Sequence, residues 1–123
     1  MNVSQLYEYF NSLYPETLRC EWDNDGLMCC SEAEREIKRV LITLDITDDA
    51  VDYGVKNEFD AIISHHPMIF KPLRSVTSSK IISLITCGIA AMSFHTRLDK
   101  ANGGVNDCLA DILGLTDCRH FGE

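Results

Sequence analysis

The chain has 123 residues, of which 46% are hydrophobic, and its formal net charge is −8 at pH 7. This length suits one domain with a hydrophobic core, and the composition is too apolar for a disordered chain. The acidic balance argues against nucleic acid as a partner, because binding to a nucleic-acid backbone needs a basic surface. No apolar stretch exceeds strand length, and the N-terminus lacks the pattern of a secretory signal. We therefore expect no membrane partner and a cytoplasmic location.

The chain contains six cysteines, an even number that would suit disulfides in a secreted protein. No pair has the C-x-x-C spacing, and the adjacent Cys29 and Cys30 are poorly placed to bind one zinc ion together. We therefore expect reduced and mostly buried thiols. The full set is Cys20, Cys29, Cys30, Cys87, Cys108 and Cys118.

The first predicted element is a helix over residues 4–14, where apolar side chains recur on one helical face. Ser4 can cap its N-terminus, and Pro15 lies just beyond its end. A turn-rich segment follows at residues 21–26, and it leads into a short apolar run over residues 27–30.

From residue 37 onward, apolar strand-like runs alternate with helical segments. This alternation predicts an α/β fold with a mainly parallel sheet. The strands are apolar almost throughout, as expected when helices cover both faces of a sheet. The expected strands are residues 37–44, 61–63 and 89–94, and the expected helices follow Thr47 and cover residues 80–87 and 105–113.

Polar, metal-binding residue types follow each of these strands. The first strand leads to Asp45, the second to His65 and His66, and the third to His95 and Asp99. Ligands of open α/β sheets bind outside the carboxyl ends of the strands, so we expect these side chains to share one edge. Imidazole and carboxylate together suit Zn, Mn, Fe, Co or Ni better than Mg or Ca, and the sequence does not distinguish among the first five.

The sequence leaves several roles open at this edge. Side chains alternate along a strand, so His65 and His66 are expected to point in different directions and to serve two metal ions rather than one. Asp45 can orient a histidine or cap the following helix. His95 can ligate metal, transfer protons, contact substrate or serve only structure.

Two weaker patterns lie near the C-terminus. The glycine-rich segment 102–106 precedes a helix and could cradle an anion, but a close backbone turn beside Asp99 is the favoured interpretation. His120 and Glu123 have the spacing of a His-x-x-Glu pair, but they follow the last predicted helix. We do not expect them to bind metal.

Four segments together resemble a known family. They are residues 21–27 (EWDNDGL), 64–73 (SHHPMIFKPL), 95–99 (HTRLD) and 103–107 (GGVND). In this order and spacing they are similar to the NIF-three-like family, also known as GTP cyclohydrolase I type 2 homologues. The resemblance covers nearly the whole chain, and the two histidine segments taken jointly are highly specific.

This resemblance implies a cytoplasmic protein with a dinuclear metal centre, built into a ring-shaped homohexamer. Carried over residue by residue, the metal ligands would be His65, His66 and Asp99. His95 matches a histidine close to the metals and is the candidate catalytic residue. Arg97 falls at a variable position of the HTRLD motif, so its presence changes the resemblance little.

Family members continue for at least as many residues again, and their second half supplies a further histidine and a glutamate. We therefore expect residues 1–123 to form a single α/β metal-binding domain, the N-terminal part of a longer protein.

Two functional hypotheses follow. The first is a metal-dependent hydrolase that acts on a nucleotide or other phosphorylated small molecule through metal-activated water. The alternative is a non-catalytic, metal-stabilised scaffold or regulatory protein-interaction module, in which ligation contributes to folding free energy.

Overall fold

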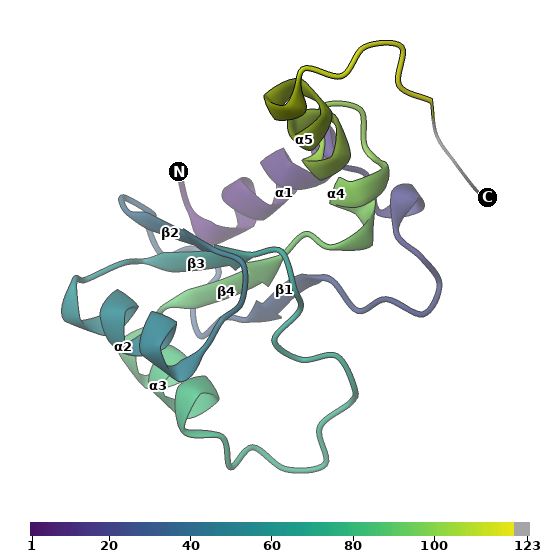
Figure 1. Ribbon diagram of the computed structural model, residues 1–123. Coiled ribbons are helices and arrows are strands. Elements are labelled where there is room, and N and C mark those ends of the chain that lie inside the picture. Colours follow the sequence, from purple (N-terminus) through teal and green to yellow (C-terminus); the bar gives the residue numbers. More distant parts are fainter. Residues whose placement is uncertain (120–123) are drawn as a thin grey trace.

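The computed structural model describes residues 1–119, so His120 and Glu123 lie outside the described residues. Helices and strands alternate through most of this part of the chain (Figure 1). The helices are α1 (Val3–Leu13), the 3-10 turn η1 (Glu16–Leu18), α2 (Asp48–Lys56), α3 (Ser79–Cys87), α4 (Thr96–Lys100) and α5 (Val105–Leu113). The strands are β1 (Gly26–Cys29), β2 (Val40–Thr43), β3 (Ala61–Ser64) and β4 (Ala90–Ser93).

The four strands form one sheet in the order β1-β4-β3-β2. β2, β3 and β4 are parallel, which confirms the expected mainly parallel α/β architecture. β1 adds an antiparallel edge beside β4, with Gly26 opposite Ser93. The short apolar run after the turn-rich segment is therefore a strand of this sheet. This pairing brings the turn before β1 close to the chain that leaves β4.

Helices cover both faces of the sheet, as the apolar strands predicted. On one face, α2 and α3 pack against a cluster that includes Val51, Ile62 and Leu84. On the other face, α1 packs through Val3 and Leu6 against the opposite side of the same strands. Figure 1 shows α2 and α3 below the sheet and α1 above it. Two apolar cores thus fix the sheet, and its carboxyl edge is left for polar side chains.

The boundaries differ from the expected ones in places. The first helix is capped by Asn2 rather than Ser4, because the Asn2 side chain accepts from the Gln5 backbone N–H at 2.8 Å and Gln5 bonds back to the Asn2 N–H at 3.0 Å. The strand expected over residues 37–44 is limited to Val40–Thr43, the part that pairs with β3. The cap at Thr47 is confirmed, since its hydroxyl accepts from the Ala50 N–H at 3.1 Å.

α4 is a helix that the sequence pattern did not predict. It is only five residues long and starts directly after His95. α5 follows it over the predicted span and ends at Gly114, which has the left-handed conformation common after helices. No helix in the described part of the chain is both long and apolar enough to cross a membrane.

The cysteines are free within residues 1–119, but the expectation that most are buried was wrong. Only Cys29 is buried, and its burial raises the pKa of the thiol, with a smaller contribution from Cys30. Three thiols are exposed because their helical or C-terminal positions face away from both cores. They are Cys87, Cys108 and Cys118.

Candidate metal centre

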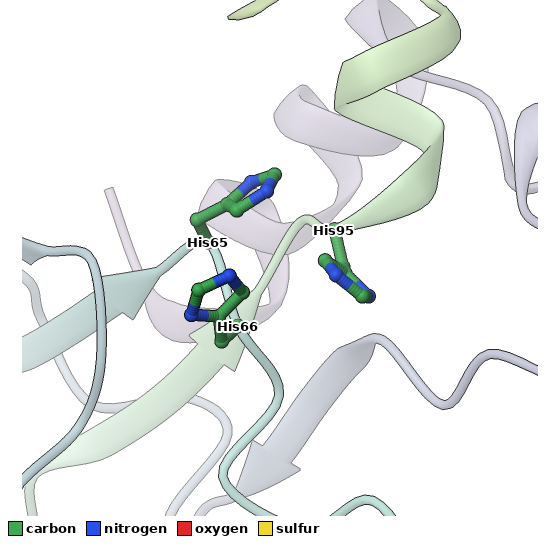
Figure 2. A group of neighbouring side chains, drawn as sticks. All are labelled: His65, His66 and His95. Carbon is green, nitrogen blue, oxygen red and sulfur yellow. The ribbon is translucent and has the colours of Figure 1, made fainter.

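Three histidines meet at the carboxyl edge of the parallel strands. His65 and His66 follow β3, and His95 follows β4. One nitrogen from each ring lies within 4.8 Å of the corresponding nitrogens of the others. Figure 2 shows the three rings gathered where these two chain segments leave the sheet. The predicted convergence of strand ends is therefore observed for all three side chains.

Hydrogen bonds at Nδ1 orient the first two rings. Nδ1 of His65 lies 3.2 Å from the Phe94 carbonyl oxygen, and Nδ1 of His66 lies 2.8 Å from a carboxylate oxygen of Asp45. Both oxygens can only accept, so each Nδ1 donates, and Nε2 is the nitrogen of each ring that is left to face a metal ion. In metal-binding histidines of other proteins, the ring nitrogen that does not bind the metal usually donates a hydrogen bond to a carbonyl or carboxylate oxygen.

His95 is held by a buried carboxylate. Its Nδ1 lies 3.0 Å from Oδ1 of Asp23, whose side chain is fully shielded from solvent. Burial raises the pKa of Asp23, but hydrogen bonds from the Thr96 hydroxyl, from His95 and from the Thr96 backbone N–H outweigh it and hold the pKa below its usual value. The carboxylate stays ionised and accepts a hydrogen bond from Nδ1, so Nε2 is the exposed nitrogen of His95 as well.

The two predicted carboxylates occupy different positions. Asp99 lies on α4, and its Oδ1 is 3.5 Å from Nε2 of His65, so it faces the free side of that ring. Asp45 bonds the opposite nitrogen of His66, and the cap of α2 is Thr47. Of the two roles considered for Asp45, the structure favours orienting His66.

The expectation that His65 and His66 point in different directions was wrong. Their ring centroids are 5.0 Å apart, and each ring also lies close to His95. β3 ends at Ser64, so both histidines lie in the bend after the strand. Alternation of side chains applies only to extended backbone, and it does not separate these two.

A buried ion pair lies behind the histidine cluster. Arg97 is fully buried and donates to both oxygens of Asp25, at 2.9 Å from Nε and 2.7 Å from Nη2. Asp25 also accepts from the His95 backbone N–H at 3.1 Å. This pair fixes the start of α4 against the turn before β1, a structural role for Arg97 that the motif comparison did not predict.

Sequence reasoning missed Asp23 and Asp25 as parts of the site. Both lie in the turn-rich segment that was treated only as a turn and a family motif. The available signal was two carboxylates in a segment that precedes a glycine. Gly26 has φ of +121°, and a side chain there would meet the Tyr7 hydroxyl at 2.8 Å. The glycine lets the chain turn so that both carboxylates reach His95 and α4.

The glycine-rich segment before α5 forms a close turn, as favoured from the sequence. A side chain at Gly104 would collide with the Leu98 and Ala101 carbonyl oxygens. The Asn106 side chain donates to the Asp99 carbonyl at 2.9 Å, which ties this segment to α4. The segment thus supports the position of Asp99.

The residues at this edge fit a divalent metal ion. With bonds of about 2.0–2.1 Å, two nitrogens on one tetrahedral ion lie about 3.4 Å apart. Ring nitrogens that lie within 4.8 Å of one another would need to approach by about 1.4 Å at most, which small side-chain rotations allow. The His65 and His95 side chains are mostly buried, and that of His66 is half-exposed, so the site is open on one side.

Comparison with protein families gives a match over the whole chain. The family model of Duf34/NIF3 (NGG1p interacting factor 3) matches residues 1–123. A Listeria innocua protein named GTP cyclohydrolase 1 type 2 homolog is 37% identical over 131 residues, covering 100% of this chain and 35% of the relative. NIF3-like protein 1 of Drosophila melanogaster is 38% identical over 122 residues, covering 95% of this chain and 42% of the relative. The chain thus spans less than half the length of these curated relatives.

Solved structures give the same result. A Bacillus cereus protein related to NIF3 superposes with a TM-score of 0.87 at 37% identity, over 95% of this chain and 33% of that one. Reduced HcgD from Methanocaldococcus jannaschii superposes with a TM-score of 0.88 at 30% identity, over 97% of this chain and 49% of that one. The fold described above is therefore shared with part of each of these longer chains.

Proposed function

The chain belongs to the Duf34/NIF3 family, and we propose that it binds divalent metal ions through His65, His66 and Asp99 to support hydrolysis of a nucleotide or other phosphorylated small molecule. GTP cyclohydrolase 1 type 2 homolog is the name of several curated relatives, which motivates nucleotides as the substrate class. Two metal ions per site is the stoichiometry that we expect.

One observation carries this proposal. All three histidines at the sheet edge have Nδ1 against an oxygen acceptor, which leaves the Nε2 side of each ring available. Asp99 adds a carboxylate on the free side of His65. An Nδ1 held by an oxygen acceptor is typical of a metal-binding histidine, as proposed here for His65 and His66. At His95 the same contact leaves Nε2 to exchange a proton.

In the proposed reaction, some residues would bind the metal ion and another would exchange a proton. A bound divalent ion would polarise a phosphoryl or carbonyl oxygen and lower the pKa of water. His65, His66 and Asp99 would hold and orient that ion. His95 would take up or release a proton at Nε2, while Asp23 keeps the proton on Nδ1 and fixes the ring plane.

Metal-dependent turnover tests this function. The purified chain is loaded with Zn²⁺, Mn²⁺ or Co²⁺ and incubated with GTP and other nucleotides, and substrate loss is followed by chromatography. We expect turnover that requires metal and falls by a factor of about 100 or more in His95→Ala, the range for loss of a general acid or base. Asp111→Ala on α5 is the matched control and should retain activity.

Two outcomes would contradict the hydrolase proposal. Turnover that survives complete metal removal would exclude a metal-dependent reaction. Stoichiometric metal with no turnover of any substrate, together with a melting temperature that rises on metal binding, would favour the metal-stabilised scaffold instead.

A further inference from the structure

Two aromatic side chains remain exposed beside the histidine cluster. Trp22 is 63% exposed and Phe70 is 45% exposed, although large aromatic residues are usually mostly buried. Their ring centroids are 6.2 Å apart, and the Trp22 ring is also 6.2 Å from the His95 ring. Trp22 therefore neighbours both Phe70 and the proposed metal centre, and it presents apolar ring surface to solvent.

These side chains come from two loops that are fixed to each other. Trp22 lies in the turn before β1, and Phe70 lies in the long segment after β3. The Asn24 side chain donates to the Ile69 carbonyl at 2.6 Å, which joins the two loops next to the aromatic pair. Asp23, next to Trp22, is bonded to His95 and Thr96. The position of Trp22 is thus fixed by the same contacts that orient His95.

The geometry of the pair favours a ligand on one face of Trp22. The two rings are inclined by 55°. A planar ring between two parallel rings needs a centroid separation of about 7 Å, twice the contact distance of about 3.5 Å. At 6.2 Å and this inclination, a flat ligand cannot enter between them. Phe70 instead supports one side of Trp22, and the exposed remainder of the indole is free to stack.

We propose that Trp22, supported by Phe70, stacks the planar heteroaromatic ring of the substrate while the substrate's phosphate groups reach the histidine edge. This inference rests on the proposed function and deepens it, because it selects ring-bearing nucleotides among phosphorylated small molecules. Stacking on an aromatic side chain strengthens the binding of any base, since every base has a π face. Trp22 is then a substrate-positioning residue that the metal ligands do not require.

The single tryptophan of the chain gives a direct measurement. Trp22 fluorescence is titrated with guanosine 5′-monophosphate and, in parallel, with ribose 5-phosphate, which has the phosphate and sugar but no ring. The titrations are made with metal-loaded and with metal-free protein, and they are corrected for nucleotide absorbance with free tryptophan derivative. We expect guanosine 5′-monophosphate to quench Trp22 fluorescence in a saturable way, and ribose 5-phosphate to leave the fluorescence unchanged.

Variants separate stacking from damage to the fold. In equilibrium dialysis, Trp22→Ala should weaken nucleotide binding by roughly tenfold, which corresponds to 1.4 kcal/mol. Trp22→Phe keeps an aromatic ring at this position and should restore most of the lost affinity. Phe70→Ala should weaken binding by a smaller factor. Tyr53→Ala removes another exposed aromatic side chain, on α2, and should leave both binding and quenching unchanged.

The possible results distinguish this inference from the proposed function. Nucleotide-specific quenching in metal-free protein supports the stacking site even if no metal-dependent turnover is found. Equal effects of both ligands, no quenching, or unchanged affinity in Trp22→Ala would overturn the stacking site. Any of these three results could occur with full metal binding, so the metal proposal would survive them.

Discussion

Arg97 is the buried residue on which the histidine edge most depends. Its guanidinium binds both oxygens of Asp25, and Nη1 also reaches Asn11 at 2.6 Å. Lysine carries one compact charge and cannot reproduce this bidentate contact, so part of Asp25 would be left without a partner. We expect Arg97→Lys to lower the free energy of unfolding by about 3 kcal/mol, measured by urea denaturation.

Arg19→Lys is the matched control for this prediction. Arg19 also approaches Asp25, at 3.6 Å, but its side chain is one-third exposed. Exposed ion pairs contribute little, so its replacement should change stability by less than about 1 kcal/mol. If the free energy of unfolding fell equally in the two variants, burial of the Arg97–Asp25 pair would not be the reason for its contribution to stability.

Asp60 gives a pH-dependent contribution away from the histidines. Burial raises the pKa of Asp60, but N–H groups of Lys38 and Arg39 and the Arg35 guanidinium outweigh it and bring the pKa below 3.8. A lowered folded-state pKa stabilises the fold above the unfolded value, and the contribution is lost as pH falls through the folded value. Asp60→Asn should therefore cost about 2 kcal/mol at pH 7 and less as pH falls below 3.8. Urea denaturation of both proteins from pH 7 to pH 3 tests this, and a constant difference would contradict it.

At the residue scale, the sequence predicted which donors converge but not what holds them. His65, His66 and His95 could be found because each follows an apolar strand. For Asp23 and Asp25 the sequence offered only two carboxylates before a glycine, and the contacts that these side chains make depend on β1 pairing with β4 in an antiparallel register. That pairing is a tertiary contact with no local signal in the segment itself.

At the element scale, the helices contribute unequally to stability. Leu84 on α3 is fully buried, whereas Ile112 on α5 is 81% exposed, and no residue of α5 is buried. Removing a buried leucine side chain leaves a cavity, so Leu84→Ala should cost about 3 kcal/mol. Ile112→Ala should change stability by less than about 0.5 kcal/mol. Thermal or urea unfolding of both variants checks this, and similar losses would contradict the burial argument.

The elements that the sequence predicted are those with a local pattern. α2 has a threonine cap, α3 and α5 end at glycines, and β3 and β4 are continuous apolar runs. α4 has five residues, which is too few for a helical period to be visible. It is held by contacts with the turn before β1 and with the segment that follows it, so its existence depends on the assembled fold.

At the scale of the whole molecule, the chain is a folded α/β unit, and most of its candidate functional side chains lie at the carboxyl edge of the parallel strands. Its match to longer family members covers only part of each. The fold could be predicted because both the alternation of elements and the family resemblance pointed to it. Strand ends and motifs predicted where the site residues lie, but they did not predict the hydrogen bonds that orient the side chains.

The central claim is that His65, His66 and Asp99 hold divalent metal. Elemental analysis of the purified chain beside Asp99→Ala and His65→Ala tests it most directly, with Asp111→Ala on α5 as the control. We predict one to two metal ions per chain in the unaltered protein and the control, and a loss of at least half in each site variant. Metal content that is unchanged in both site variants would contradict the assignment.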